Sequence, residues 1–149
     1  MLGTLTDLQM NHLLASQVRG RIACTNGKRS FILPFTYIFD GNYLYGELHD
    51  KRKMEVLRKN PGVCFEIDLM HGLTNWQEVI IEGKIEQLRG EEENKAREFL
   101  SEHIYPFTID KNSFKTKATS GILNKRASKP IFCRIKIEKK SGCFEREFV

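Results

Sequence analysis

Residues 44–61, LYGELHDKRKMEVLRKNP, determine how this sequence is interpreted, because an apolar strand runs directly into a cationic helix. Asp50 is suited to cap that helix, and Pro61 cannot continue it. The cationic residues 51–53 then occupy the first turn, where they oppose the positive end of the helix dipole. A phosphate would compensate them by accepting hydrogen bonds from free backbone N–H groups and from side chains together. The stretch therefore predicts an anion site, with a solvated basic turn as the alternative.

The length and composition of the chain are typical of one globular domain. Its 149 residues are 40% hydrophobic and 29% charged, which is the ordinary range for a domain that buries a core. The sequence contains no apolar run long enough to span a membrane and no secretion signal at its start. We therefore expect a single domain over residues 1–149, without a membrane segment and located in the cytoplasm.

The net charge of +5 raises the question of a nucleic-acid partner. Residues 111–129 hold six cations and no acids, but Phe114 is their only aromatic residue. Proteins that bind single strands usually interleave cations with aromatic rings on which bases stack. This pattern therefore does not favour a nucleic-acid partner. We expect residues 106–129 to form a mobile loop, because they have few core positions and long loops often act as lids.

The cysteine and histidine residues do not predict a metal site or a disulfide. The four cysteines form no CxxC pair, and the four histidines are scattered along the chain. A structural zinc site would need ligands clustered at short spacing. We interpret the three cysteines within apolar runs as small buried hydrophobic residues, namely Cys24, Cys64 and Cys133.

Alternating apolar residues and turn signals predict a mainly β protein. Asn26-Gly27 and Asp40-Gly41 are tight-turn signals between successive strands. A capping box at Thr6 and two amphipathic patterns predict helices that flank the strands. A small antiparallel barrel is the simplest arrangement, because closure removes exposed edges. The six expected strands are residues 19–25, 30–39, 42–45, 62–69, 76–88 and 130–138, and the helices are 6–16, 51–59 and 90–105.

Three local features modify this pattern. Pro34 removes one ladder donor from its strand, which predicts an edge or a bulge where a ligand could approach the backbone. Gly83 lies in the middle of a long strand and predicts a bulge or a close backbone contact. Residues 139–149 either extend the last strand or cross to a partner.

The order of these features resembles the flavin-nucleotide-binding split-barrel proteins, the relatives of pyridoxamine 5'-phosphate oxidase, and in particular the branch of the nitroimidazole-resistance proteins. The resemblance covers roughly residues 2–140. It implies a six-stranded antiparallel split β-barrel with two to three flanking helices, which forms a homodimer and binds FMN at the interface. The motifs that carry it are the hairpin around Pro34, LYG at 44–46, Arg52-Lys53 at the helix start, NPxVCFE at 60–66, and WxxVxxxG at 76–83.

The resemblance also implies which residues contact the cofactor. Arg52 and Lys53 match the pair that holds the FMN phosphate. The other implied contacts are Leu33, Pro34, Phe35 and Thr36 along the isoalloxazine, Tyr45 and Gly46 beside the phosphate, Trp76 and Gln77 across the interface, and Arg21 as a second phosphate contact.

Two positions depart from the family pattern. Lys51 stands where many relatives have glycine, which adds a cation and changes the turn. Many relatives have histidine at or beside the position of Glu47, and His49 is the nearest substitute. These departures weaken the assignment of a nitroreductase within the family.

We predict an FMN-dependent oxidoreductase that acts on a small aromatic or nitro-heteroaromatic molecule. The flavin would supply the chemistry, so the lack of a Ser-His-Asp or paired-carboxylate arrangement does not count against an enzyme, and no catalytic residue is assigned. One alternative is a non-catalytic module that binds or stores flavin or haem. A weaker alternative is a basic nucleic-acid-binding barrel.

Overall fold

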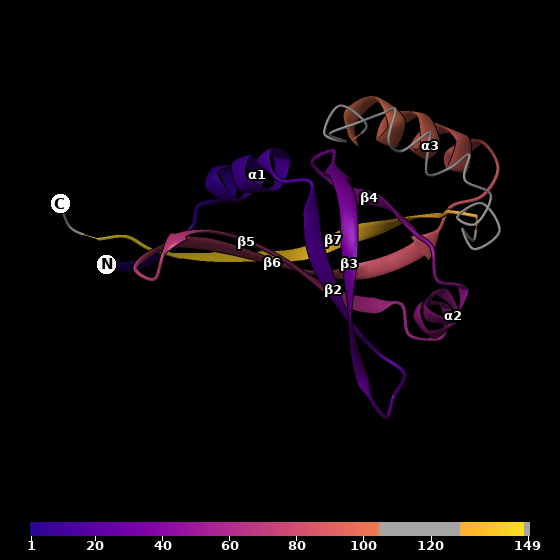
Figure 1. Ribbon diagram of the computed structural model, residues 1–149, viewed down its shortest axis with the longest axis horizontal. Helices are drawn as coiled ribbons and strands as arrows, with labels where there is room; N and C mark the ends of the chain where they lie inside the picture. Colours follow the sequence, from indigo (N-terminus) through magenta and orange to yellow (C-terminus); the bar gives the residue numbers. More distant parts are fainter. Residues whose placement is uncertain (105–128, 148–149) are drawn as a thin grey trace, which may run out of the picture.

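The computed structural model describes residues 1–104 and 129–147, and seven antiparallel strands in these ranges form one sheet that closes on itself (Figure 1). The sheet order is β1-β7-β4-β3-β2-β5-β6, and pairing between β6 and β7 closes the ring. The elements are β1 (Leu2–Thr4), α1 (Asp7–Ser16), β2 (Arg19–Thr25), β3 (Ser30–Phe39), β4 (Tyr43–Leu48), α2 (Lys51–Lys59), β5 (Gly62–Gly72), β6 (Asn75–Gln87), α3 (Glu91–Ile104) and β7 (Ile131–Glu145).

Strand β7 is long enough to pair with different strands along its length. Its residues 131–136 pair with β4, whereas residues 133–145 pair with β6. Its last residues, 143–145, also pair with β1. The hairpin end of β5 and β6 therefore extends away from the ring together with β1 and the end of β7. We call this extension, which carries the N-terminus in Figure 1, the arm.

Alternation along the strands places one continuous apolar core inside the ring. Phe65 is fully buried, and its ring meets those of Phe35 and Tyr37 edge-on, with centroids 6.1 and 5.0 Å apart. The Tyr37 hydroxyl donates a hydrogen bond of 2.6 Å to the Leu14 carbonyl, which ties α1 to the core. Helix α2 adds Met54 and Leu57 to the same cluster. Both helices are thus held by buried apolar side chains.

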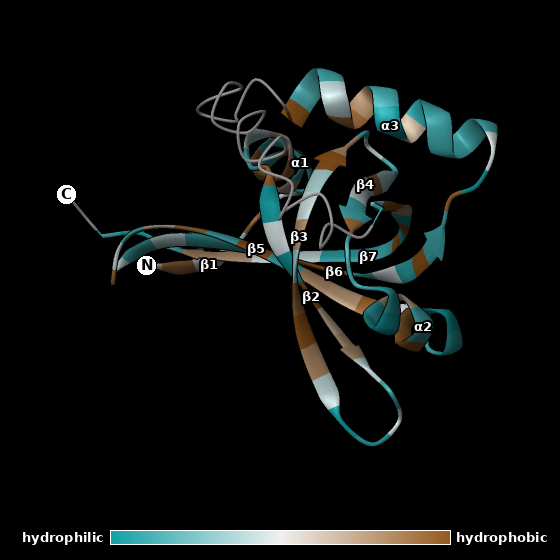
Figure 2. Ribbon diagram, turned by 45° about the vertical axis from the view of Figure 1, so that its right-hand side comes forward, coloured by the Kyte–Doolittle hydropathy of each residue, from teal (hydrophilic) through white to brown (hydrophobic). Residues whose placement is uncertain are grey.

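Helix α3 covers the outer side of β3 and β4, and many of its residues are hydrophilic, as the teal parts of its ribbon show in Figure 2. Its buried residues Ala96 and Leu100 belong to a second, smaller cluster with Ile38 of β3 and Phe132 of β7. Half-buried Tyr45 packs against this cluster. Helix α3 therefore covers one part of the outer face of β3 and β4 and leaves the part near α2 to form the site described below.

The structure confirms the split-barrel prediction and its six strands, and adds a seventh. Strand β1 has only three residues, too few for an alternation signal, and it exists through its pairing with β7. Strand β5 continues to Gly72 and β6 begins at Asn75, so most of the interval between the expected strands 62–69 and 76–88 is also strand. The C-terminal segment extends β7 as far as Glu145. The loop predicted for 106–129 lies almost entirely outside the described residues.

A register shift between Glu82 and Gly83 confirms the predicted irregularity in β6. A Cβ at position 83 would lie 2.1 Å from the Lys136 carbonyl oxygen, so the backbones approach too closely for a side chain. None of the helices in residues 1–104 and 129–147 is both long and apolar enough to cross a bilayer.

Candidate functional site

A groove of about 730 Å³ opens between the edge of β3 and the start of α2. Its volume falls within the range of roughly 300–1,000 Å³ that is usual for small-molecule sites. We call it the α2 groove. Six residues proposed from the sequence as cofactor contacts line it, namely Leu33, Pro34, His49, Lys51, Arg52 and Lys53, together with Glu47, Leu48 and Asp50.

One wall of the α2 groove is a strand edge. Strand β3 pairs with β2 through residues 30–36 and with β4 only through residues 37–39. Among the described residues, the part of β3 from 30 to 36 therefore has a neighbour on one side only. Pro34 lies in this part, where a missing N–H costs no ladder hydrogen bond. The sequence predicted an edge or a bulge at Pro34, and the structure shows an edge.

The other wall is the first turn of α2, which is organised by Asp50. Its Oδ1 accepts hydrogen bonds from the N–H groups of Arg52 at 2.9 Å and Lys53 at 3.3 Å. The cap predicted from the sequence is therefore present. The sequence predicted a phosphate that accepts hydrogen bonds from backbone N–H groups and side chains together, and in the structure Asp50 occupies these two N–H groups. An anion at this corner would have to be held mainly by side chains.

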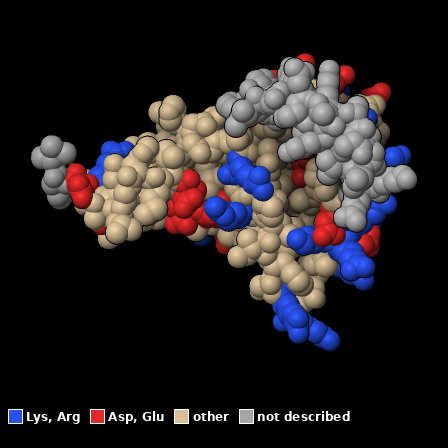
Figure 3. Space-filling view, viewed as in Figure 1, with Lys and Arg blue, Asp and Glu red and all other residues tan. Residues whose placement is uncertain are grey.

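The side chains around the groove give it an uneven charge. Lys51, Arg52 and Lys53 are all exposed, and Lys and Arg side chains gather around α2 in Figure 3. The acids in the same lining are engaged: Asp50 caps the helix, and a Glu47 carboxylate oxygen lies 3.5 Å from His49 Nε2. The first turn of α2 therefore presents three cationic side chains on which an anion could settle.

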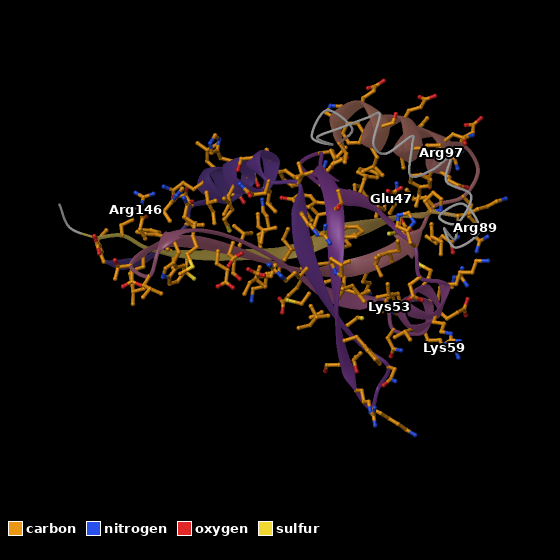
Figure 4. All side chains as sticks on the ribbon, viewed as in Figure 1. Glu47, Lys53, Lys59, Arg89, Arg97 and Arg146 are labelled. Carbon is orange, nitrogen blue, oxygen red and sulfur yellow. The ribbon has the colours of Figure 1, made fainter. Side chains whose placement is uncertain are left out.

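Glu47 connects the α2 groove to a smaller cavity beneath α3. In Figure 4 it lies between Arg97 of α3 and Lys53 of α2. The smaller cavity has a volume of about 40 Å³, and Thr36 and Arg97 are among its lining residues. Sequence reasoning did not single out Glu47 as a site residue. Its alternation with buried Leu48 and Gly46 is the signal that places it on the outer face.

Three other proposed contacts have structural roles. The Phe35 side chain is fully buried in the core. Gly46 gives that ring room, because a Cβ there would lie 2.3 Å from a Phe35 ring carbon. Tyr45 packs edge-on against Phe99 of α3, with centroids 5.9 Å apart, and burial raises the pKa of its hydroxyl. The side chains of Phe35 and Tyr45 therefore do not line the α2 groove.

Arg21 lies on the outer face of β2, opposite Pro34. Its guanidinium is 3.5 Å from Glu66 and 3.6 Å from Asp68, both on β5. Burial and the charges of Asp68 and Glu78 raise the pKa of Glu66, an effect that Arg21 partly opposes. Arg21 thus forms ion pairs with acidic residues of β5, and it is not among the residues that line the α2 groove.

Trp76 and Gln77 lie in the arm, at the opposite end of the molecule from α2 in Figure 1. The Trp76 indole N–H donates a hydrogen bond of 3.0 Å to a Glu145 carboxylate oxygen. Leu73 at the hairpin turn and Met70 nearby are strongly exposed apolar residues. Within one chain, the structure does not bring Trp76 or Gln77 to the groove.

Comparison with known proteins gives one family. The model of the pyridoxamine 5'-phosphate oxidase family matches residues 7–142. An uncharacterised protein of Rhizobium meliloti is 31% identical over 68 residues, which are 46% of this chain and 45% of that relative. The match thus spans less than half the length of the relative.

Two solved structures share the fold over nearly the whole chain. A FAD-binding protein from Mesorhizobium loti is 24% identical, with 99% of this chain and 98% of that chain covered and a TM-score of 0.74. A protein from Bacteroides thetaiotaomicron, assigned to 5-nitroimidazole antibiotic resistance, is 15% identical, with 97% and 89% covered and a TM-score of 0.72. These likenesses establish the barrel architecture.

Proposed function

The chain belongs to the pyridoxamine 5'-phosphate oxidase family, and we propose that it binds FMN, with the phosphate held by the side chains of Arg52 and Lys53. The observation that supports this proposal most strongly is the α2 groove itself, in which three consecutive cations face a strand edge. A similar fold in a FAD-binding protein is consistent with it.

The residues in the groove fit the two ends of FMN. Arg52 offers a planar fork of N–H donors and Lys53 a point charge, which together suit a phosphate dianion. Asp50 fixes the backbone from which both side chains project. Exposed Pro34 provides an apolar surface, and the free edge of β3 leaves main-chain groups available to the polar rim of a flavin ring.

We further propose that the protein is an oxidoreductase that acts on a small aromatic or nitro-heteroaromatic molecule. Bound flavin supplies hydride and electron transfer, so the chain has to bind, orient and shield the reactants. Lys51 and His49 line the same groove and would add positive charge or a hydrogen bond beside the cofactor. This chemistry requires no nucleophile or paired carboxylates from the chain.

The absorption spectrum of the protein after incubation with FMN and removal of the excess tests this function. We expect flavin bands at one flavin per chain, bleaching with a reduced pyridine nucleotide without oxygen, and recovery when a nitroaromatic acceptor is added. Bound flavin that never bleaches with any such donor would favour a storage module. A protein that retains no flavin would contradict the proposal.

We also propose a homodimer in which Trp76 and Gln77 of one subunit reach the flavin of the other. The arm is the support for this idea, because it projects beyond the ring and carries exposed Leu73 and Met70. Half-buried Trp76 is held by Glu145 and would offer a rigid, flat surface to a ligand.

Replacing Trp76 by alanine should weaken FMN binding about tenfold, as expected when an aromatic contact is truncated. Flavin titration and the mass in solution would be measured together. Trp76→Phe keeps a ring but loses the bond to Glu145, so it should retain most of the affinity. A monomer that binds FMN with unchanged affinity after Trp76→Ala would contradict the shared site.

A further inference from the structure

A second cavity adjoins the α2 groove along the free edge of β3. Its volume is about 270 Å³, and it is lined by Cys24, Phe31, Asp50, Arg52, Lys53 and Val56. Asp50, Arg52 and Lys53 also line the α2 groove, so the first turn of α2 is a wall common to both spaces. We call the second space the Phe31 cavity.

The Phe31 cavity combines an apolar interior with a cationic rim. The Phe31 ring and Val56 are half-buried, and Cys24 is only 6% exposed. Burial raises the pKa of the Cys24 thiol, against the opposing charge of Lys53, so the neutral thiol behaves as a small apolar group. Arg52 and Lys53 supply positive charge at the boundary with the α2 groove. An occupant should therefore have a flat apolar body attached to an anionic group.

The spacing of the two cavities suggests how one ligand could fill both. Phe31 and Leu33 are two residues apart on the extended strand β3, which is about 7 Å. The Phe31 cavity and the α2 groove are therefore adjacent, and Arg52 and Lys53 of α2 line both of them. In FAD, a diphosphate joins riboflavin to adenosine.

We infer that the Phe31 cavity receives the adenine of FAD, with the diphosphate on Arg52 and Lys53 and the riboflavin part in the α2 groove. The inference rests on the proposed flavin site and extends it to a specific nucleotide. Phe31 provides a ring on which the base stacks, and Arg52 provides a cation beside that stack. The cavity is near the lower limit of ligand pockets, which suits one base and not a whole second cofactor.

Titration of flavin-free protein with FMN and with FAD tests this inference. We expect FAD to bind at least about tenfold more tightly than FMN, because the base gains a stacking contact. Val56→Trp fills the Phe31 cavity and should lower FAD affinity to that of FMN without changing FMN affinity. Lys59→Trp places the same side chain at an exposed position of the same helix that lines neither cavity, and should change neither affinity.

A second variant tests the same cavity without crowding it. Phe31→Ala removes the stacking ring and should weaken FAD about tenfold while FMN affinity stays constant. Equal affinities of the unaltered protein for FMN and FAD would overturn the inference and leave the proposed flavin site intact. Equal losses for both flavins in Val56→Trp and Phe31→Ala would also overturn it. Failure to bind either flavin would contradict the proposed function itself.

Discussion

Replacing Arg52 and Lys53 by alanine together should strip flavin from the protein while the barrel remains folded. Both side chains are exposed and line the two cavities, so they contribute little to the core. The backbone N–H groups of both residues donate hydrogen bonds to the Asp50 carboxylate, and alanine retains these groups. Loss of two charge-assisted contacts, each about 1.5–3 kcal/mol, should raise the dissociation constant by roughly a hundredfold or more. Fluorescence titration with FMN and the far-ultraviolet CD spectrum check the two parts of this expectation.

The turn between β2 and β3 offers a matched control. Lys28 and Arg29 are an adjacent exposed Lys-Arg pair, and their backbone N–H groups bond to the Asn26 side chain. Lys28→Ala with Arg29→Ala therefore removes the same two charges at a site outside the α2 groove. This control should retain flavin. Equal losses in both double variants would assign the effect to net charge, and full flavin stoichiometry in the Arg52 and Lys53 variant would rule out the phosphate assignment.

The anion corner was predictable from the sequence because the information that specifies it is local. A strand end, a capping aspartate and three cations occur within residues 44–53, so no distant contact is needed to bring them together. The sequence could not show how the cap uses the helix terminus. Asp50 can cap the helix or leave its amides free for a ligand, and only the hydrogen bonds to Arg52 and Lys53 decide between these arrangements.

The direction of each strand side chain was harder to predict. Tyr45 belongs with α3 because β4 lies between β3 and β7, and that neighbourhood is set by pairing between residues far apart in the chain. The resemblance to a family implied that residues 33–36 of β3 run beside a cofactor. It did not distinguish the residues that face the core from those that face outward. Phe35 and Pro34 are neighbours in sequence, but the first lies in the core and the second in the groove.

The arm was also hard to predict from the sequence, because it depends on pairing between residues far apart in the chain. The β5–β6 pattern was read from alternation, but its extent past Leu69 and its pairing with the end of β7 were not. Strand β1 depends wholly on that extension, because its partners are residues 143–145. An edge element of three residues has no periodicity of its own, so it can be recognised only once its neighbour is placed.

Gly83→Ala should cause a large loss of stability, because the substitution acts where two backbones meet. The new Cβ would lie 2.1 Å from the Lys136 carbonyl oxygen and 3.0 Å from Ile135 Cγ2. A main-chain carbonyl in a paired strand cannot move aside as the end of a flexible side chain can. The register shift at Glu82 and Gly83 must therefore open, or the closing pair of the barrel must separate.

We expect the free energy of unfolding to fall by about 3 kcal/mol, at the upper end of ordinary overpacking, with a melting temperature lower by roughly 10 °C. Gly62→Ala is the matched control, since residue 62 lies on β5 opposite Lys84 and a Cβ there meets nothing within 4 Å. That variant should be as stable as the original protein or slightly more stable, because alanine restricts the unfolded chain. Urea unfolding of both variants decides the matter. If Gly83→Ala and Gly62→Ala have equal midpoints, the close contact between β6 and β7 does not determine how the ring closes.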